Sequence, residues 1–303
     1  MISLRPAGTD EDLEAWRRVR MAILPYERAG SVEELRRAET PERLFLVAEL
    51  DGELAGSGFA NRSDQAGIGA LGPRVLPAYR RRGLGTALLH ALADHLVALG
   101  FPETNAVVDD EGSLAFAERF GFREVDRQVE QVRAIAPREE PPRPPDGIEL
   151  VTLADRPELA QTVYADLAAE AFADIPVDPP LRVSAEDWER EWVTFPEGSF
   201  VALAGSEIVG CAGLMRDPDH PDRAEHGLTA VRRDWRGRGV ALALKQATIA
   251  WAAANGVREL FTWTQRGNES MQRVNERLGY AVRHRSVMLR APLPLLSQAE
   301  VGV

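Results

Sequence analysis

The hydrophobic and polar positions of the chain follow one order twice, once in each half. Each half has an early helical region, a pair of apolar strands around a glycine turn, a third strand, a glycine-containing loop, a long helix, a fourth strand and a final helix. The early helical regions lie at about residues 10–38 and 158–173, and the strand pairs at 44–56 and 200–211. Strands that alternate with helices predict a fold of the α/β class, and their repetition predicts an internal duplication.

The long helix of each half carries an apolar stripe with helical spacing. The stripe consists of Leu84, Leu88, Leu92 and Leu96 in the first half and of Val240, Leu244, Ala247 and Trp251 in the second. Such spacing is typical of a helix that packs one face on a sheet. We therefore predict that both helices lie on a sheet and are held there by these residues.

The loop before each long helix has the pattern R-x-x-G-x-G/A. It reads Arg80-Arg81-Arg82-Gly83-Leu84-Gly85 in the first half and Arg236-Gly237-Arg238-Gly239-Val240-Ala241 in the second. A strand that turns through glycines into a helix leaves backbone N–H groups unpaired at the helix start, where they and the helix dipole bind anions. The arginines add charged donors. The pattern predicts two phosphate-binding loops.

Two common phosphate-binding motifs do not fit these loops. A P-loop needs a Lys-Ser/Thr pair after its glycines, which neither copy has. A dinucleotide-binding loop needs a third glycine, but Leu88 and Leu244 stand in that place.

The length of the chain indicates two domains, and its acidic charge favours cationic small molecules as partners. The 303 residues exceed one typical core, and a formal net charge of −11 disfavours nucleic acid and anionic membranes as partners. Cys211 is the only cysteine and no signal-peptide pattern or membrane-spanning segment is present, so we expect a cytoplasmic location. The proline-rich segment 137–146 predicts a linker between an N-terminal domain, 1–136, and a C-terminal domain, 147–303.

The second half ends in a further motif, N-x-x-M-x-x-x-N-x-x-L-G-Y, which runs from Asn268 to Tyr280. With this motif and the two loops, nearly the whole chain resembles the GNAT superfamily of acyl-CoA-dependent N-acyltransferases. The resemblance implies two tandem domains, each a mixed, mostly antiparallel sheet flanked by helices, with a splayed cleft for acyl-CoA. It also implies acetyl-CoA, or another acyl-CoA, as co-substrate and no metal.

The resemblance assigns residues of both halves to the acyl-CoA. In the second half these are Ala230, Val231, Arg236, Gly237, Arg238, Gly239, Val240, Ala241 and Asn268. In the first half they are Val75, Arg80, Arg81, Gly83, Leu84, Gly85 and Thr86. The loop residues would hold the pyrophosphate, Val231 the pantetheine arm, and Asn268 would stand on the far wall of the cleft.

The two halves differ where the family carries out its chemistry. Family members polarise the thioester carbonyl with a strand N–H seven residues before the motif arginine, where the second half has Thr229 and the first has Pro73, which lacks an N–H. Eleven residues before the arginine the family often has a glutamate that deprotonates the amine. A gapless alignment puts Glu225 there in the second half and Gly69 in the first. We therefore expect a catalytic C-terminal domain and a degenerate N-terminal domain.

The general acid is less defined. Many relatives have a tyrosine four residues before the final glycine, but here Asn275 stands there, and an amide cannot give up a proton. Either the thiolate leaves unaided, or another group such as Tyr280 protonates it. Tyr280 is also a candidate for a packed core aromatic.

Other polar residues have simpler interpretations. We expect the segment around Asp217, His220 and His226 to be an acidic loop rather than a metal site, and Cys211 to be a buried structural thiol. Two segments, Asp174-Ile175-Pro176 and Trp188 to Trp192, are candidates for part of the acceptor site.

The sequence therefore predicts an N-acyltransferase, most simply an acetyltransferase, that acts on a primary amine of a small molecule, as a monomer or homodimer. One alternative is a non-catalytic acyl-CoA-binding or sensing protein. Another is a nucleotide-binding protein that uses the same loops.

Overall fold

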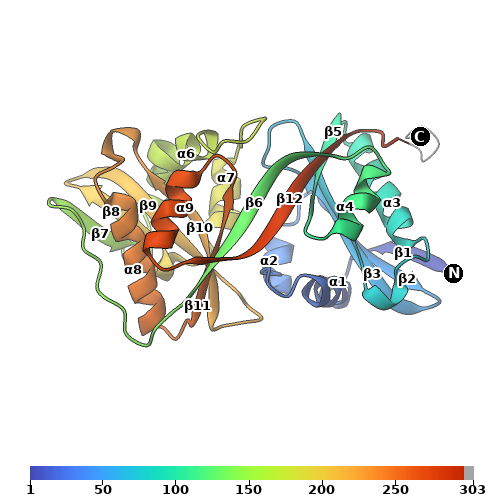
Figure 1. Ribbon diagram of the computed structural model, residues 1–303, viewed down its shortest axis with the longest axis horizontal. Coiled ribbons are helices and arrows are strands. Elements are labelled where there is room, and N and C mark those ends of the chain that lie inside the picture. Colours follow the sequence, from blue (N-terminus) through green and yellow to red (C-terminus); the bar gives the residue numbers. More distant parts are fainter. Residues whose placement is uncertain (297–303) are drawn as a thin grey trace. The chain divides into compact units, whose positions relative to one another are not determined.

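The computed structural model describes residues 1–296, apart from the side chain of Glu191. The chain forms two compact units (Figure 1). The first consists of Met1–Arg127 together with the C-terminal segment from Ser286, and the second of Gln128–Arg285.

The helices and strands alternate in both units, as the hydrophobic pattern predicts. The first unit begins with β1 (Ile2–Pro6), α1 (Asp10–Ile23), α2 (Val32–Arg37), β2 (Leu44–Leu50), β3 (Glu53–Arg62), β4 (Gly69–Val75), the 3-10 turn η1 (Pro77–Tyr79), α3 (Leu84–Ala98), β5 (Glu103–Val108) and α4 (Glu111–Glu118). The strand β6 (Arg123–Ala134) follows.

The second unit repeats this order with more helical turns near its start. Its elements are β7 (Ile148–Thr152), α5 (Leu159–Val163), η2 (Tyr164–Ala168), α6 (Ala169–Ala173), α7 (Ala185–Asp187), η3 (Trp188–Trp192), η4 (Pro196–Gly198), β8 (Phe200–Ala204), β9 (Glu207–Arg216), β10 (Arg223–Val231), η5 (Arg233–Trp235), α8 (Val240–Ala254), β11 (Glu259–Gln265) and α9 (Glu269–Arg277). The last strand is β12 (Ala281–Pro292).

Each unit has one mixed, mostly antiparallel sheet. The strand order is β1-β2-β3-β4-β5-β12 in the first unit and β6-β11-β10-β9-β8-β7 in the second. The only parallel pairs among the described residues of these sheets are β4 with β5 and β10 with β11. The mixed sheet expected from the family resemblance is therefore confirmed.

The last strand of each sheet comes from the other half of the sequence. In the first unit β5 pairs with β12, where Leu289 lies opposite Ala106. In the second unit β11 pairs with β6, where Gln131 lies opposite Thr262. The compact units therefore differ from the sequence-based domains 1–136 and 147–303, because the segment that closes each sheet lies outside them.

The apolar stripes bury the long helices against the sheets. All four leucines of the α3 stripe are buried, and an added Cβ at Gly58 of β3 would lie only 2.8 Å from Leu92. On α8, Val240 and Leu244 approach Gly210 of β9 in the same way. The close approach explains why glycines face these helices, and it fixes where each helix begins relative to the sheet. No helix in the described part of the chain is both long and apolar enough to span a bilayer.

Candidate functional site

The R-x-x-G-x-G/A loops have the same backbone shape in both units. Their second and fourth positions are left-handed, with φ of 62° at Arg81 and 84° at Gly83, and of 77° at Gly237 and 87° at Gly239. The first bond inside α8 runs from the N–H of Ala243 to the carbonyl of Gly239, at 3.0 Å. The N–H groups of the first turn therefore have no acceptor within the helix and can bind an anion.

The first arginine of each motif binds its own strand. Nε of Arg236 donates to the carbonyl of Val231 at 3.0 Å, and Nε of Arg80 donates to the carbonyl of Val75 at 3.1 Å. This shared contact holds the loop against the strand that precedes it. Because the same hydrogen bond forms in both units, both arginines have a role in shaping the loop.

In the second unit the same arginine also binds an acidic side chain. Asp174 contacts Nη2 of Arg236 at 2.7 Å and Nη2 of Arg233 at 2.5 Å. Hydrogen bonds from Arg233 and Arg236 lower the pKa of Asp174 to about 2. Arg238 remains exposed, with its guanidinium 4.8 Å from the centre of the Trp235 ring. Among residues 1–296, no carboxylate is paired with Arg238, so this arginine keeps its charge available to a ligand of the loop.

A cleft opens between the parallel strands of each unit. In the second unit β10 and β11 pair only over Arg223–Glu225, although both strands continue for several residues. In the first unit β4 and β5 pair only at Gly69 and Ala70. Both strand pairs therefore separate toward the glycine loop, and the predicted splayed cleft is confirmed.

The strand β10 turns some of its backbone groups into this cleft. The N–H of Arg232 donates to Val209 of β9 at 3.0 Å. Because N–H groups alternate in direction along a strand, the N–H of Ala230 also faces β9, whereas those of Thr229 and Val231 face the side on which β11 has separated. Thr229 and Val231 therefore offer donors to a ligand in the cleft, but Ala230 does not.

The first unit has the same alternation but a different chemistry. The N–H of Leu76 donates to Ala55 of β3 at 2.9 Å, so that Pro73 and Val75 face the cleft. Pro73 has no N–H. The first unit therefore lacks the donor that Thr229 supplies in the second.

A β-bulge distinguishes β10 from β4. His226 pairs with Leu214 and Thr229 with Ala212, so that Gly227 and Leu228 lie opposite a single residue of β9. The β3–β4 pairing shows no such shift. Bulges bend a strand and redirect its side chains, and they are common beside active sites.

The bulge corrects the alignment of the two halves by one residue. Glu225 pairs with Phe261 as the last residue before the second cleft, and Ala70 pairs with Asn105 as the last residue before the first. Glu225 therefore corresponds to Ala70 and not to Gly69, because β10 contains one residue more. The first unit still has no carboxylate at this position.

Glu225 stands where the cleft begins. It is half-buried, and its neighbours Ala224 and His226 point to the opposite face of the sheet, where Ala224 packs with Ile249 of α8. An added Cβ at Gly227, on the same face as Glu225, would lie 3.7 Å from the Trp192 ring. The carboxylate therefore lies at the fork of the strands and on the side of the early helices.

The two candidate acids lie in the core of the second unit. Asn275 is buried and its Nδ2 donates to Oε1 of Gln131 at 2.9 Å, which ties α9 to β6. Tyr280 is buried, and its hydroxyl lies 2.6 Å from Nε2 of His226. Burial raises the pKa of Tyr280. Both side chains therefore have partners within the core.

Asn268 begins α9 directly after β11. Its Oδ1 accepts a hydrogen bond from Ser270 at 3.3 Å, and the side chain is half-buried. An added Cβ at Gly267 would lie 2.9 Å from Pro176. The segment that follows α6 therefore borders both this loop and, through Asp174, the glycine loop.

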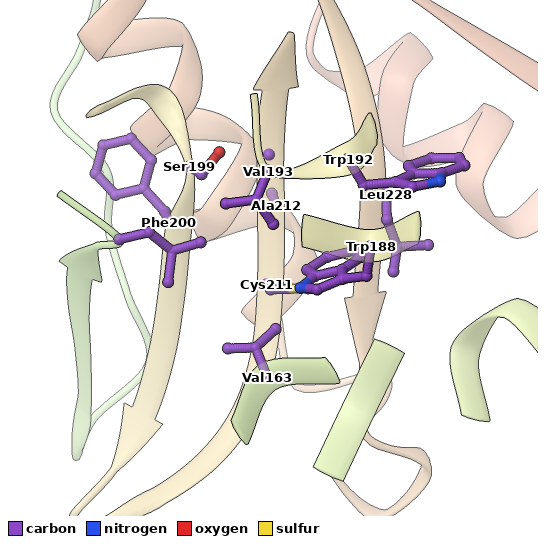
Figure 2. Close-up of a pocket in the computed structure, with 11 residues that line it drawn as sticks. Val163, Trp188, Trp192, Val193, Ser199, Phe200, Cys211, Ala212 and Leu228 are labelled. Carbon is purple, nitrogen blue, oxygen red and sulfur yellow. The ribbon is translucent and has the colours of Figure 1, made fainter. Parts of the chain in front are cut away.

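A small apolar pocket lies on the early-helix face of β9 and β10 (Figure 2). Trp188 and Trp192 border it from the helical side, and Leu228 borders it from the bulge. Cys211 also lines it; burial raises the pKa of this thiol to about 12, as suits a structural cysteine. The pocket is thus adjacent to the strand segment that carries Thr229.

The polar loop before β10 forms a turn. The carboxylate of Asp217 accepts hydrogen bonds from the backbone N–H groups of Asp219 and His220, at 3.1 and 3.2 Å. Within residues 1–296, no group of three or more His, Cys, Asp or Glu side chains is arranged to hold a metal ion.

Sequence reasoning missed one buried polar group in the second unit. Lys245 of α8 is buried, its Nζ has no hydrogen-bond partner, and it lies 5.4 Å from the centre of the Tyr280 ring. Burial lowers its pKa to about 7, and burial with the charge of Lys245 lowers the pKa of His226. The sequence signal for this group was a lysine within the apolar part of a helix. The spacing along the helix does not show that His226 and Tyr280 are its neighbours.

Comparison with known proteins decides the family. The model of the acetyltransferase (GNAT) family matches residues 10–122 and again residues 161–280. The chain belongs to the GNAT family of acetyltransferases. Each half of this GNAT protein thus contains one copy of the family's domain, and the enzyme is an N-acetyltransferase. Members of the family use acetyl-CoA as co-substrate.

Curated relatives of this GNAT protein include several named mycothiol acetyltransferase. That of Nocardiopsis dassonvillei is 30% identical over 82% of this chain and 82% of its own length. That of Brachybacterium faecium is 30% identical over 74% of this chain and 69% of its own.

Solved structures show the same tandem fold. A GCN5-related N-acetyltransferase from Sphaerobacter thermophilus has a TM-score of 0.74 and 24% identity, and covers 96% of this chain and 95% of its own. A tandem GNAT protein from the clavulanic acid biosynthesis pathway has a TM-score of 0.75 and 20% identity, with 96% and 98% covered.

Proposed function

We propose that the second unit transfers an acetyl group from acetyl-CoA to a primary amine of a small molecule, and that the first unit does not catalyse this reaction. The observation that carries the proposal concerns the backbone N–H at one equivalent strand position of the two units. The N–H of Thr229 faces the cleft of the second unit, whereas Pro73 occupies the corresponding place in the first and has no N–H to offer.

The co-substrate is held by the loop and by the strand before it. The N–H groups from Gly237 to Ala241 and the exposed guanidinium of Arg238 bind the pyrophosphate. The N–H of Val231 binds the pantetheine arm, and Asn268 borders the cleft at the end of β11. Val240 contributes only its backbone, because its side chain is buried in the core.

Glu225 is the general base in this proposal. An alkyl ammonium has a pKa of about 10.4 and cannot attack until it loses a proton, which the Glu225 carboxylate accepts directly or through water. The amine nitrogen then forms a bond to the thioester carbon. The N–H of Thr229 stabilises the negative charge on the carbonyl oxygen. The nitrogen then loses its second proton to solvent, and the C–S bond breaks as the amide forms.

The thiolate leaves without a protein acid. Asn275 donates to Gln131, and the Tyr280 hydroxyl is bonded to His226 within the core, so neither is assigned to this step. A thiol pKa of about 8.5 makes the thiolate an adequate leaving group, which afterwards takes a proton from solvent.

The acceptor is a small molecule. The relatives named mycothiol acetyltransferase support this class of acceptor, since they match across most of the chain. The small apolar pocket beside Leu228 lies on the same face as Glu225 and suits an apolar part of the amine.

Thiol release from acetyl-CoA with a panel of amines tests the proposal. Glu225→Gln should lower kcat by about 10²- to 10⁴-fold at pH 7 and less at higher pH, where more amine is already neutral. Glu149→Gln, an exposed carboxylate on the edge strand β7, is the matched control and should keep its rate. Unchanged turnover of Glu225→Gln at every pH would remove the base from the proposal.

A further inference from the structure

The first unit has a polar side-chain cluster where the second has its apolar pocket. Arg74 of β4 lies opposite Ser57 of β3, and the register matches them to Ala230 and Cys211 in the second unit. Residues directly opposite on antiparallel strands share one face of the sheet. The same face thus carries an arginine and a serine in one unit and two apolar side chains in the other.

Two polar atoms of this cluster have no hydrogen-bond partner. They are Nη1 of Arg74 and Oγ of Ser57, both inaccessible to solvent. Ser57 is completely buried, whereas Arg74 is half-buried and so still reaches the surface in part. Unpaired buried donors of this kind are rare in folded proteins and call for an explanation.

Aromatic rings hold the Arg74 guanidinium in place. Its central carbon lies 5.2 Å from the centre of the Phe59 ring and 5.8 Å from that of Trp16, whose Nε1 donates to Gly58 at 2.8 Å. Such stacking orients a planar guanidinium and leaves its N–H edge for a planar anion.

The neighbouring charges already have partners of their own. Arg20, also over the Trp16 ring, pairs with Glu27 at 2.7 Å, and the carboxylate of Asp109 accepts a hydrogen bond from Tyr26. Burial and the charge of Arg20 lower the pKa of Arg74 to about 9, while Glu27, Tyr26 and Asp109 raise it, so Arg74 stays charged at neutral pH.

We infer that Arg74 and Ser57 form a carboxylate-binding site in the first unit, separate from the acetyl-transfer site of the second. A guanidinium N–H and a hydroxyl both donate to a carboxylate, and Nη1 of Arg74 and Oγ of Ser57 are the two donors of this cluster without a partner. The ligand is either a free dicarboxylate or the carboxyl end of an acyl group on CoA. The first unit retains a glycine loop for CoA but, with Pro73, cannot turn it over.

Calorimetric titration of the full chain with succinate, acetyl-CoA and succinyl-CoA tests this site. If the carboxylate is free, succinate binds the wild type. If CoA carries it, succinyl-CoA binds more tightly than acetyl-CoA. In either case Arg74→Ala, which introduces the residue type of the second unit, should weaken the carboxylate-dependent binding at least tenfold, and Arg74→Lys should weaken it less.

Two measurements keep this test independent of folding and of turnover. Arg18→Ala removes an exposed charge from α1 and should bind each probe within twofold of wild type. Arg74→Ala without ligand should have an unchanged or higher Tm, because an unpaired buried donor is gone. The inference is overturned if neither succinate nor the succinyl group adds binding to wild type, or if Arg74→Ala binds as well as wild type.

Discussion

Replacement of Thr229 by proline tests the assignment of the oxyanion donor. The change removes the N–H that faces the cleft and puts into β10 the residue that β4 has at the same register, opposite Gly58. Because the N–H of this position faces away from β9, proline removes no hydrogen bond from the β9–β10 pairing. Loss of one preorganised oxyanion donor costs about 2.7–4 kcal/mol, or about 10²- to 10³-fold in kcat.

The matched control keeps the N–H and changes only the side chain. The hydroxyl of Thr229 is buried and has no hydrogen-bond partner, so Thr229→Val should keep kcat and raise the free energy of unfolding by up to about 1 kcal/mol. Thiol release at saturating acetyl-CoA gives kcat, and calorimetry with CoA shows that the loop still binds.

Two results would show that the N–H of Thr229 is not the oxyanion donor. One is a Thr229→Pro protein that binds CoA and keeps kcat within threefold of wild type. The other is an equal loss of kcat in Thr229→Val, which would assign the effect to the side chain.

Three further predictions concern the second unit. From pH 7 to 9, the free energy of unfolding of the wild type should rise by about 1 kcal/mol per pH unit relative to that of Lys245→Met. The reason is that the buried amine loses its proton near pH 7, whereas the lysine of the unfolded chain loses it only near 10.5. Equal pH profiles of the two proteins in chemical denaturation would contradict this. A fragment of residues 128–285 should unfold in a cooperative transition followed by circular dichroism. A fragment of residues 147–303 should not, because that fragment lacks β6 and leaves Asn275 without Gln131. A folded fragment 147–303 would be the contrary result. Cys211 should react with an aromatic disulfide reagent only on unfolding, and fast labelling of the native protein would show that its burial is wrong.

Much of the fold follows from local patterns in the sequence. The stripes of α3 and α8 predict the helices that pack on the sheets, because apolar residues at helical spacing can be buried only in that way. The two glycine loops predict the left-handed turns, since glycine adopts positive φ without strain. In the first loop Arg81 adopts this conformation as well, which the sequence does not reveal.

The exchange of the last strands could not be predicted from the sequence. The segments of β6 and β12 follow equivalent helices and have similar alternation, so the pattern does not specify which sheet each one joins. Proximity along the chain favours the pairing that is not observed, and only the three-dimensional register with β11 and β5 distinguishes them.

The candidate site was predictable in part. Thr229 and Pro73 occupy equivalent positions in the structure, as the gapless alignment predicts, because the bulge of β10 lies before Thr229. In the structure Glu225 corresponds to Ala70 and not to Gly69, because β10 has one additional residue between Glu225 and Thr229. No local pattern in the sequence marks where this bulge lies. The partners of Tyr280 and Lys245 come from distant segments, which spacing along one helix cannot show.

The most direct test of which unit is catalytic is a matched pair of loop variants assayed for thiol release with acetyl-CoA and an accepted amine. Ala241→Glu and Gly85→Glu put a carboxylate at the same place in the two loops, and at Gly85 an added Cβ meets only ordinary contacts, 3.6 Å from Phe116. If only the second unit is catalytic, Ala241→Glu abolishes turnover and Gly85→Glu leaves it at the wild-type rate. Turnover that survives Ala241→Glu and is lost in Gly85→Glu would contradict this.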